Sequence, residues 1–201
     1  MPRSAHTRDI ARAAVRAELA QTAFELFRRD GFDRVTVSEL AAAAGVSRST
    51  FLRYFGSKEE AALHVFDAHG GLTADALRAR PAGEDDWTAL RRALDTVIEL
   101  YRADPAGALA ITRLVQATPA LCARNLEKQQ CWRPELTRAL ADRTGAPPSA
   151  TLALSVRVAA AMDCLNIALA HWSDSDGQRD LEELLDEAFA ALTTGSRAPR
   201  K

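Results

Sequence analysis

The sequence predicts an all-α protein of about nine helices, in which a three-helix N-terminal unit precedes a larger helical domain. Three observations support this prediction. Apolar residues recur at helical spacing in every long segment, whereas no segment alternates apolar and polar residues over the length of a strand. Capping residues and glycines stand where such helices would begin and end. The 201 residues, 47% hydrophobic and 26% charged, are enough for one or two globular domains.

Composition excludes several classes of protein. The cysteines Cys122, Cys131 and Cys164 are odd in number and too few for a disulfide framework, so we expect a reducing cytoplasm and buried thiols. No apolar stretch approaches the ~20 residues of a membrane span. The arginine-rich N-terminus also lacks the apolar run of a signal peptide. We therefore expect a cytoplasmic protein that does not enter the membrane.

Caps and glycines define the first four helices. Leu19, Ala23 and Phe27 form the apolar face of a helix that begins between residues 6 and 9 and ends before Gly31. Capping residues then open three helices, which we place at 37–44, 48–55 and 58–80. The last of these is expected to bend at its glycine pair, residues 70 and 71.

Longer helices follow Gly83. Capping residues, two of them directly before a proline, place these helices at about 86–103, 105–117, 119–144, 150–173 and 178–194. Pro134 is expected to kink the third of them. Ser149 is expected to cap the fourth.

Residues 37–55 are the most informative stretch. Two helices of about two turns, joined at Gly45, cross steeply only where the contacting residues are small, as Ala41 is. Arg48 and Arg53 then lie on the outer face of the second helix, whose exposed N-terminus suits entry into a DNA major groove. An arbitrary helical hairpin remains the alternative if spacing is considered alone.

Charge is unevenly distributed along the chain. Residues 1–58 contain ten Arg and Lys against six Asp and Glu, a net charge of +4, so the remainder carries −5 of the total of −1. A basic module followed by an acidic one suggests that only the first contacts a polyanion. Chance scatter of surface charge would give the same pattern.

A set of short strings carries a family resemblance: Leu19–Phe27 (LAQTAFELF), Gly31-Phe32, Thr36-Val37, Leu40-Ala41, Ala44–Ser47 (AGVS), Thr50-Phe51, Tyr54-Phe55 and Ser57–Glu59 (SKE). In order and spacing they resemble the N-terminal domain of TetR-family transcriptional regulators. The resemblance implies a helix-turn-helix DNA-binding domain at 1–58, a helical effector-binding and dimerisation domain at 59–195, and a flexible tail at 196–201.

The resemblance also implies roles for single residues. The residues expected to contact the bases are Arg48, Ser49 and Arg53. The expected phosphate contacts are Thr36, Ser38, Thr50, Tyr54 and Lys58, and Ser47 is a further expected DNA-binding residue. Many family members carry a DNA-contacting Tyr where this chain has Leu52, so that role is either absent or moves to Arg53 and Tyr54. Arg3, Arg8 and Arg12 either reach the DNA or form a solvated basic tail.

The second domain resembles that of an actinobacterial subgroup. The matching segments are Thr118–Leu121 (TPAL), Leu126–Gln129 (LEKQ), Trp132, Ala159–Trp172 and Leu184–Ala188 (LLDEA). This subgroup includes mycofactocin-system regulators and is described as binding acyl-CoA-like ligands. The resemblance implies a one-component repressor that binds a pseudo-palindromic operator in double-stranded DNA as a homodimer and is released by a hydrophobic effector. An activator, or a helical ligand-binding or adaptor protein without operator binding, are the alternatives.

The effector pocket is expected between the helices that follow Ser57, the first of which would join both domains. Its expected lining is mostly apolar or aromatic, as an elongated hydrophobic compound requires: Phe66, Trp87, Leu94, Tyr101, Leu114, Trp132, Met162, Cys164 and Asn166. For each of these residues, a place in the core is the alternative.

The last two helices carry apolar rows that are too wide for one neighbour, which predicts a twofold four-helix dimer interface. These rows are Leu165, Leu169 and Trp172 on the first helix, and Leu181, Leu185, Ala188 and Leu192 on the second. Packing within their own domain is the alternative. No constellation of catalytic residues, metal ligands or cofactor-binding loops stands out, so we expect neither an enzyme nor a metal- or cofactor-binding protein.

Overall fold

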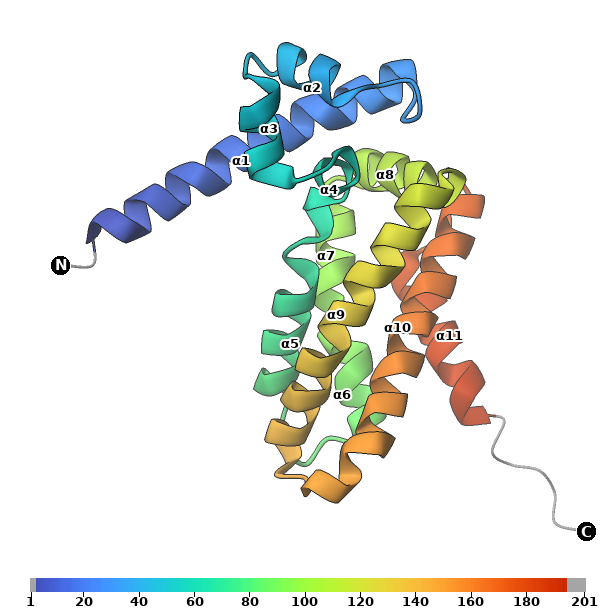
Figure 1. Cartoon of the computed structure of the whole chain (residues 1–201). Coiled ribbons are helices and arrows are strands. Elements are labelled where there is room, and N and C mark those ends of the chain that lie inside the picture. The colour runs from blue at the N-terminus through green and yellow to red at the C-terminus, as the bar shows by residue number, and fades with distance from the viewer. Residues whose placement is uncertain (1–2, 195–201) are drawn as a thin grey trace, which may run out of the picture. The chain divides into compact units, whose positions relative to one another are not determined.

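The computed structural model describes residues 3–194, and all regular structure in this range is helical (Figure 1), which confirms the predicted fold class. The helices are α1 (Arg3–Asp30), α2 (Val37–Ala43), α3 (Arg48–Phe55), α4 (Lys58–Ala62), α5 (His69–Ala79), α6 (Asp86–Ala93), α7 (Asp95–Ala103), α8 (Pro105–Ala117), α9 (Pro119–Thr144), α10 (Thr151–Asp174) and α11 (Leu181–Thr194). Two 3-10 turns, η1 (His64–Phe66) and η2 (Pro148–Ala150), precede α5 and α10.

The described residues form two compact units. Unit 1 comprises residues up to Asp67 together with Leu114–Asn125, and unit 2 comprises Ala68–Arg113 and the residues from Leu126 onward. The chain thus passes between units nine residues after the expected boundary at residue 58, and the α8–α9 corner belongs with the N-terminal helices. The expected flexible tail, 196–201, lies outside the described residues.

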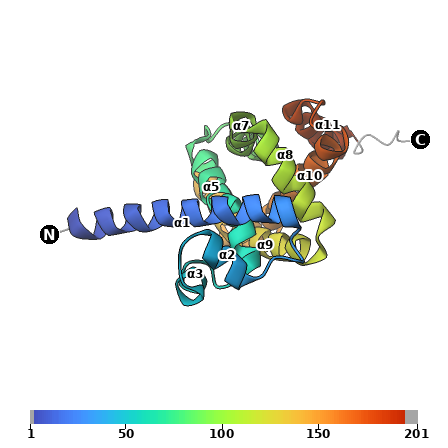
Figure 2. The same cartoon turned by 90° about the horizontal axis from the view of Figure 1, so that it is seen from above.

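Unit 1 is built on the second half of α1. Its buried residues Leu19, Ala23 and Phe27 pack toward α2–α4, and the Phe27 ring lies 4.9 Å from that of Phe32. Viewed from above, α2 and α3 lie side by side along α1 (Figure 2). This packing holds the two short helices in place, because helices of two turns are not stable alone.

The expected single helix over 58–80 is wrong, because the chain is broken between α4 and α5. The backbone changes to i→i+3 hydrogen bonds, in which Phe66 N donates to Leu63 O and Asp67 N donates to His64 O. The Asp67 carboxylate is bound by Arg16 of α1 at 3.0 Å and by His64 Nδ1 at 2.9 Å. These tertiary contacts fix the turn ahead of the glycine pair, which lies inside α5.

Three further helix boundaries differ from expectation. The expected helix over 86–103 is interrupted at Leu94, next to the point where the Thr96 hydroxyl donates to Ala93 O at 2.9 Å. The fourth long helix begins after the η2 turn, so Ser149 does not cap it. The last begins at Leu181, where the Asp180 carboxylate accepts from the Glu182 and Glu183 N–H groups.

Unit 2 packs around α10. Its Leu154, Val158 and Leu165 lie in a core that includes side chains of α5, α6, α7, α9 and α11. By length and hydropathy α10 is the one described helix that passes as a membrane span, or one of two if the bent pair α8–α9 is taken as a single span. Its buried face shows instead the composition of a core helix.

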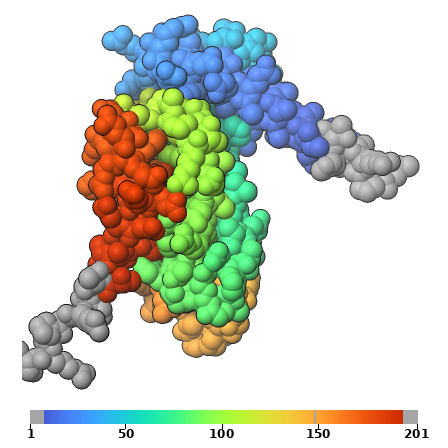
Figure 3. Space-filling model, turned by 180° about the vertical axis from the view of Figure 1, so that it is seen from behind, coloured from blue at the N-terminus to red at the C-terminus, as the bar shows by residue number. Residues whose placement is uncertain are grey.

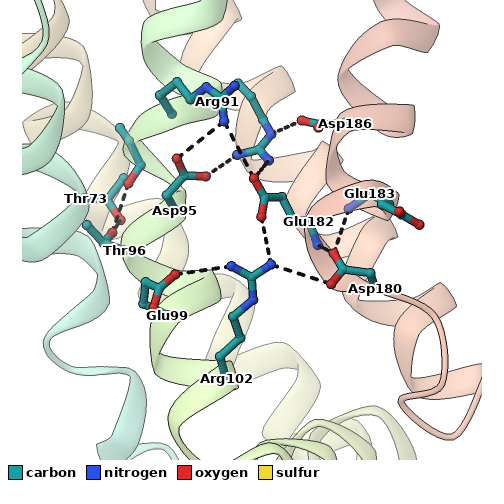
Figure 4. Close-up of polar contacts among 12 residues, drawn as sticks. Thr73, Arg91, Asp95, Thr96, Glu99, Arg102, Asp180, Glu182, Glu183 and Asp186 are labelled. Carbon is teal, nitrogen blue, oxygen red and sulfur yellow. Dashed lines mark hydrogen bonds and ion pairs between the residues drawn. The ribbon is translucent and has the colours of Figure 1, made fainter.

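Ion pairs bind α6 and α7 to α11 (Figure 4). The buried Arg91 guanidinium contacts Asp186 through Nε and Asp95 through Nη1. Arg102 Nη2 donates to Glu182 Oε2 at 2.7 Å. This network joins α11 to α6 and α7, and α11 forms a continuous strip of the unit 2 surface (Figure 3).

A second buried guanidinium closes the loop between α5 and α6. Arg143 donates through Nη1 to Pro81 O and Glu84 O, at 2.7 and 2.8 Å, and through Nη2 to Asp86 Oδ1 at 2.6 Å. The other oxygen of Asp86 accepts from the exposed Arg157. Asp86 is therefore shared between one buried and one exposed arginine.

Candidate nucleic-acid interface

Helices α2 and α3 form a helix-turn-helix whose first helix begins with a capping box. The Glu39 N–H donates to Thr36 Oγ1 at 3.3 Å, and the Thr36 N–H donates to Glu39 Oε2 at 2.8 Å. The Thr36 backbone N–H, and then its hydroxyl, hold the pKa of Glu39 below its ordinary value. This stabilisation is therefore present above the ordinary pKa of the glutamate and is lost as the pH falls through its lowered folded-state value.

The turn between the helices depends on Gly45. Its φ of +67° lies in the left-handed region that favours glycine. This turn lets Val46 N reach Ala41 O at 2.9 Å. Leu40 and Phe51 are then fully buried between the two helices, which fixes the angle at which α3 leaves the domain.

The N-terminus of α3 is presented to solvent. Ser47 caps the helix by accepting from Thr50 N at 3.1 Å, and its hydroxyl also contacts those of Ser49 and Thr50. The remaining sides of the helix are anchored by Phe51 and Phe55, whose ring centroids are 5.2 Å apart. The exposed residues of α3 are Arg48, Ser49 and Arg53.

Most of the residues expected to contact DNA are accessible on the surface of unit 1. Thr36, Ser38, Ser47, Arg48, Ser49 and Arg53 are exposed, whereas Thr50, Tyr54 and Lys58 are half-buried. The hydroxyls of Ser47 and Thr50 already serve the cap of α3. Exposed guanidinium and hydroxyl groups at the start of a helix can hydrogen-bond to base edges and phosphates.

Lys58 is placed differently from the other expected phosphate contacts. Its Nζ donates to Phe32 O at 2.9 Å and to Val35 O at 3.3 Å, and lies 4.3 Å from the centre of the Phe32 ring. The ammonium group therefore joins the start of α4 to the loop that precedes α2. Sequence reasoning missed this role because the acceptors lie 26 and 23 residues away.

Replacing Lys58 by methionine is expected to lower the free energy of unfolding by about 1–2 kcal/mol, because two half-buried carbonyls lose a charged donor. Urea denaturation of the whole chain measures this change. Arg53→Met is the matched control: it removes an exposed cation from the same unit and should leave the denaturation midpoint unchanged. If Lys58→Met left the denaturation midpoint unchanged but weakened DNA binding, Lys58 would be a phosphate contact rather than a structural residue.

The residues expected to line an effector pocket do not form one group. Phe66 and Leu114 belong to unit 1, and the others belong to unit 2. There, Leu94, Tyr101, Met162 and Cys164 are part of the buried core, and Trp87 and Trp132 pack against it. Trp87 lies on Phe189, with ring centroids 4.4 Å apart, and its Nε1 donates to Phe189 O.

Trp132 and Tyr101 both lie near His69. The His69 ring centroid is 6.3 Å from that of Trp132 and 6.5 Å from that of Tyr101. Gly70 permits this arrangement, because a Cβ there would lie 2.5 Å from the Trp132 ring. Burial raises the pKa of Tyr101, so its hydroxyl stays neutral.

A partly buried amide pair lies one turn from Trp132. Gln129 Nε2 donates to Asn166 Oδ1 at 2.9 Å, and Asn166 Nδ2 donates back to Gln129 Oε1 at 2.8 Å. Sequence reasoning named Asn166 but missed Gln129 and His69. Nothing in the local sequence marks these two as buried, because the neighbouring helices create their burial.

The cysteines differ in exposure. Cys122 and Cys131 are exposed, so the expectation of buried thiols is wrong for these two, which lie on the outer faces of α9. Cys164 is buried, and burial, assisted by the neighbouring Asp163 carboxylate, raises its pKa. Within the described part of the chain, no three His, Cys, Asp or Glu side chains are grouped closely enough to hold a metal ion.

The residues expected at the dimer interface are divided between core and surface. Leu165, Trp172, Leu181 and Leu185 are buried within their own chain, where they fill the contact between α10 and α11. Leu169 and Ala188 are half-buried, and Leu192 is exposed. The apolar surface of α10 consists of other residues, Leu152, Val156 and Ile167, which are more than half exposed.

Comparison with known proteins agrees with this architecture. Residues 19–65 match the model of bacterial regulatory proteins of the TetR family, and residues 84–197 match the MftR C-terminal domain. TcmR, a helix-turn-helix transcriptional regulator of Streptomyces glaucescens, is 38% identical over 65% of this chain, and the match spans 60% of its own length. MftR of Mycobacterium tuberculosis, assigned to the regulation of mycofactocin biosynthesis, is 29% identical over 88% of both chains.

Solved structures share the fold. FadR of Thermus thermophilus, a TetR-family transcriptional repressor solved in complex with lauroyl-CoA, superimposes with a TM-score of 0.61. The two proteins are 24% identical, and the match covers 92% of this chain and 98% of FadR. With a C-terminal family match over more than half of the chain and a helix-turn-helix match before it, this protein belongs to the TetR family of bacterial transcriptional regulators and carries a C-terminal domain of the MftR type.

Proposed function

We propose that this protein is a one-component transcriptional repressor, which binds a pseudo-palindromic operator as a homodimer and is released by a long-chain acyl compound. The observation that carries the proposal is the exposed start of α3, where Arg48, Ser49 and Arg53 project from a helix held rigidly by α2. Its function is regulatory rather than enzymatic, and its place is the cytoplasm, where bacterial DNA lies.

The chemistry of α3 suits the major groove. An arginine pairs bidentately with guanine O6 and N7, and a serine hydroxyl bonds to either a base edge or a phosphate. Thr36 and Ser38, exposed at the start of α2, suit phosphate contacts that set the register of the protein on the duplex. Base contacts determine which DNA sequence is bound, whereas phosphate contacts position the protein on the duplex. Sequence preference should therefore depend on Arg48 and Arg53.

The second chain of the proposed dimer binds the outer face of α10. Leu152, Val156 and Ile167 lie on the side of this helix opposite its core residues, together with the half-buried Ala160. These exposed apolar side chains form a typical protein–protein surface, which also contains Asp163, paired with Arg133 of α9 at 3.6 Å. A twofold axis there pairs two recognition helices, which then read two half-sites about one helical turn apart.

Replacing Ile167 by glutamate is expected to convert the dimer to monomers, because two carboxylates would be buried at the seam. Sedimentation velocity measures the assembly. Leu126→Glu, which places the same charge on an exposed leucine of α9, should leave the dimer intact. If Ile167→Glu remained a dimer, the interface would have to lie on another face of the molecule.

The effector site lies near Trp132, Tyr101 and His69. Aromatic side chains there suit an apolar chain, and the Gln129–Asn166 amide pair offers hydrogen bonds to a carbonyl group. The complex of Thermus thermophilus FadR with lauroyl-CoA shows that the fold can hold an acyl compound. These features together support an acyl-CoA-like effector for this chain.

Helix α9 provides a route from effector to DNA. Its residues through Asn125 belong to unit 1, whereas Gln129 and Trp132 belong to unit 2. At its unit 1 end, Arg124 Nε donates to Glu60 Oε1 of α4 at 2.6 Å, and α4 directly follows the recognition helix α3. A ligand that shifts α9 at Trp132 would thus act on α4. By linkage, the ligand lowers operator affinity by the same factor by which DNA lowers ligand affinity.

Two titrations test the proposal. Operator DNA should bind the purified chain with an affinity that falls steeply with salt, as several phosphate contacts require. Long-chain acyl-CoAs should then release the DNA and change tryptophan fluorescence, and Trp132→Phe should abolish the fluorescence change. If no acyl-CoA binds more tightly than free CoA or affects operator affinity, the effector assignment fails. If no operator is bound, the regulatory assignment fails.

A further inference from the structure

The first half of α1 extends beyond the core of unit 1. The helix has 28 residues, and a straight helix of that length spans roughly 42 Å. Its buried side chains begin only at Leu19, whereas residues 8–15, 17 and 18 are exposed. In Figure 2 the N-terminal part of α1 extends past α2 and α3. Packing within the domain therefore does not account for these turns.

A row of arginines follows one face of this extension. Arg8, Arg12 and Arg16 are four residues apart, so they lie above one another on the helix. The Arg12 guanidinium lies 5.9 Å from the Tyr54 ring, and that of Arg16 lies 5.3 Å from the Phe55 ring. Tyr54 and Phe55 are the last two residues of α3. The row thus begins beside the recognition helix and continues outward from it.

The chemistry of the row favours a polyanion over an apolar partner. Residues 8–16 contain three arginines and one aspartate. The exposed apolar side chains of the extension, Ile10 and Val15, are five residues apart and therefore lie about 140° from each other around the helix. They form no continuous apolar face on which a membrane or a protein groove would bind.

We propose that Arg8 and Arg12 form a second DNA-contact element, which binds the phosphates of the duplex that flanks the half-site read by α3. The inference rests on the proposed function, because it continues the surface of α3 outward along the DNA. The minor groove, at ~6 Å wide, does not admit the helix itself, so we assign the row to the phosphates at the edge of the groove, whose contacts carry no sequence information. From Arg8 to Arg12 the helix advances about 6 Å, so the two guanidinium groups can face neighbouring phosphates, whereas Arg16 is bound to Asp67.

Two operator duplexes test the inference. The short one ends at the outer edges of the two half-sites, and the long one carries about ten more base pairs, or one helical turn, on each side. The double variant Arg8→Gln/Arg12→Gln should bind the long duplex about tenfold more weakly than wild type, and the short duplex equally well. The slope of log affinity against log salt on the long duplex should fall by about 0.9 for each phosphate that the variant no longer binds.

Two controls separate charge from structure. Arg8→Lys/Arg12→Lys should retain most of the affinity, because phosphate binding needs a cation rather than a guanidinium. Arg138→Gln/Arg179→Gln removes the same net charge from exposed positions of unit 2 and should leave both affinities unchanged. Helical content by circular dichroism should be the same in all variants.

Several results overturn the inference. Equal affinities of wild type and the glutamine variant for the long duplex would show that the row does not touch DNA. An equal loss of affinity on both duplexes would place the bound phosphates inside the half-sites. In either case wild type still binds its operator, so the proposed function stands; a wild-type chain that binds neither duplex would refute the proposed function itself.

Discussion

The double variant Arg48→Ala/Arg53→Ala is expected to bind operator DNA at least about 30-fold more weakly than wild type, because each arginine–guanine pair contributes about 1–3 kcal/mol of discrimination. Each single variant should lose preference at its own base pair while keeping it at the others. Binding to a set of operators with single base changes measures both effects.

Exposure makes this test clean. Arg48 and Arg53 are exposed and the α3 cap does not depend on either side chain, so the variants should fold as wild type does. The exposed pair Arg138→Ala/Arg179→Ala is the charge-matched control and should bind normally. Wild-type affinity and specificity in the double variant would show that α3 does not read the operator.

Replacing Arg143 by methionine is expected to cost about 3–5 kcal/mol of unfolding free energy, the typical cost of removing one partner from a buried ion pair. The side chain is 1% exposed, and its loss would leave Pro81 O, Glu84 O and Asp86 Oδ1 without their donor, while Arg157 stays bound to Asp86 Oδ2. Chemical denaturation of the whole chain measures the change.

Arg157→Met provides the matched comparison. Arg157 binds the other oxygen of the same carboxylate but is 49% exposed, so its removal should cost less than about 1 kcal/mol. If the two variants had the same free energy of unfolding, Arg143 would not be the residue that anchors the α5–α6 loop to α9.

Features that depend on local chemistry were predictable from the sequence. The capping box at Thr36 and Glu39, the left-handed Gly45 and the cap at Ser47 each determine their own few residues, and the structure has all three. The short helices α2 and α3 could therefore be placed to within a residue. The family resemblance came from the same residues, because this small domain is built from local signals.

Features that depend on contacts between residues far apart in the chain could not be predicted from the local sequence. The break at η1 follows from Asp67 binding Arg16, 51 positions earlier in the chain, and Lys58 turns inward to carbonyls of the loop before α2. Which residues of α10 face the core of their own chain could not be assigned for a related reason. Helix α10 is apolar around much of its circumference, so its sequence does not indicate which side meets its own core. Leu165 and Trp172 meet that core, and Ile167 faces outward.

In the proposed dimer, α3 reads a specific operator as half of a symmetric pair. Hydroxyl-radical footprinting of the purified chain on the genomic fragments that it selects tests this claim most directly. We expect protection of two inverted half-sites, centred about ten base pairs or a small multiple of that apart on one face of the duplex. The protection should be lost in Arg48→Ala/Arg53→Ala. Selected fragments that share no inverted repeat, or a footprint unaltered by that double variant, would contradict it.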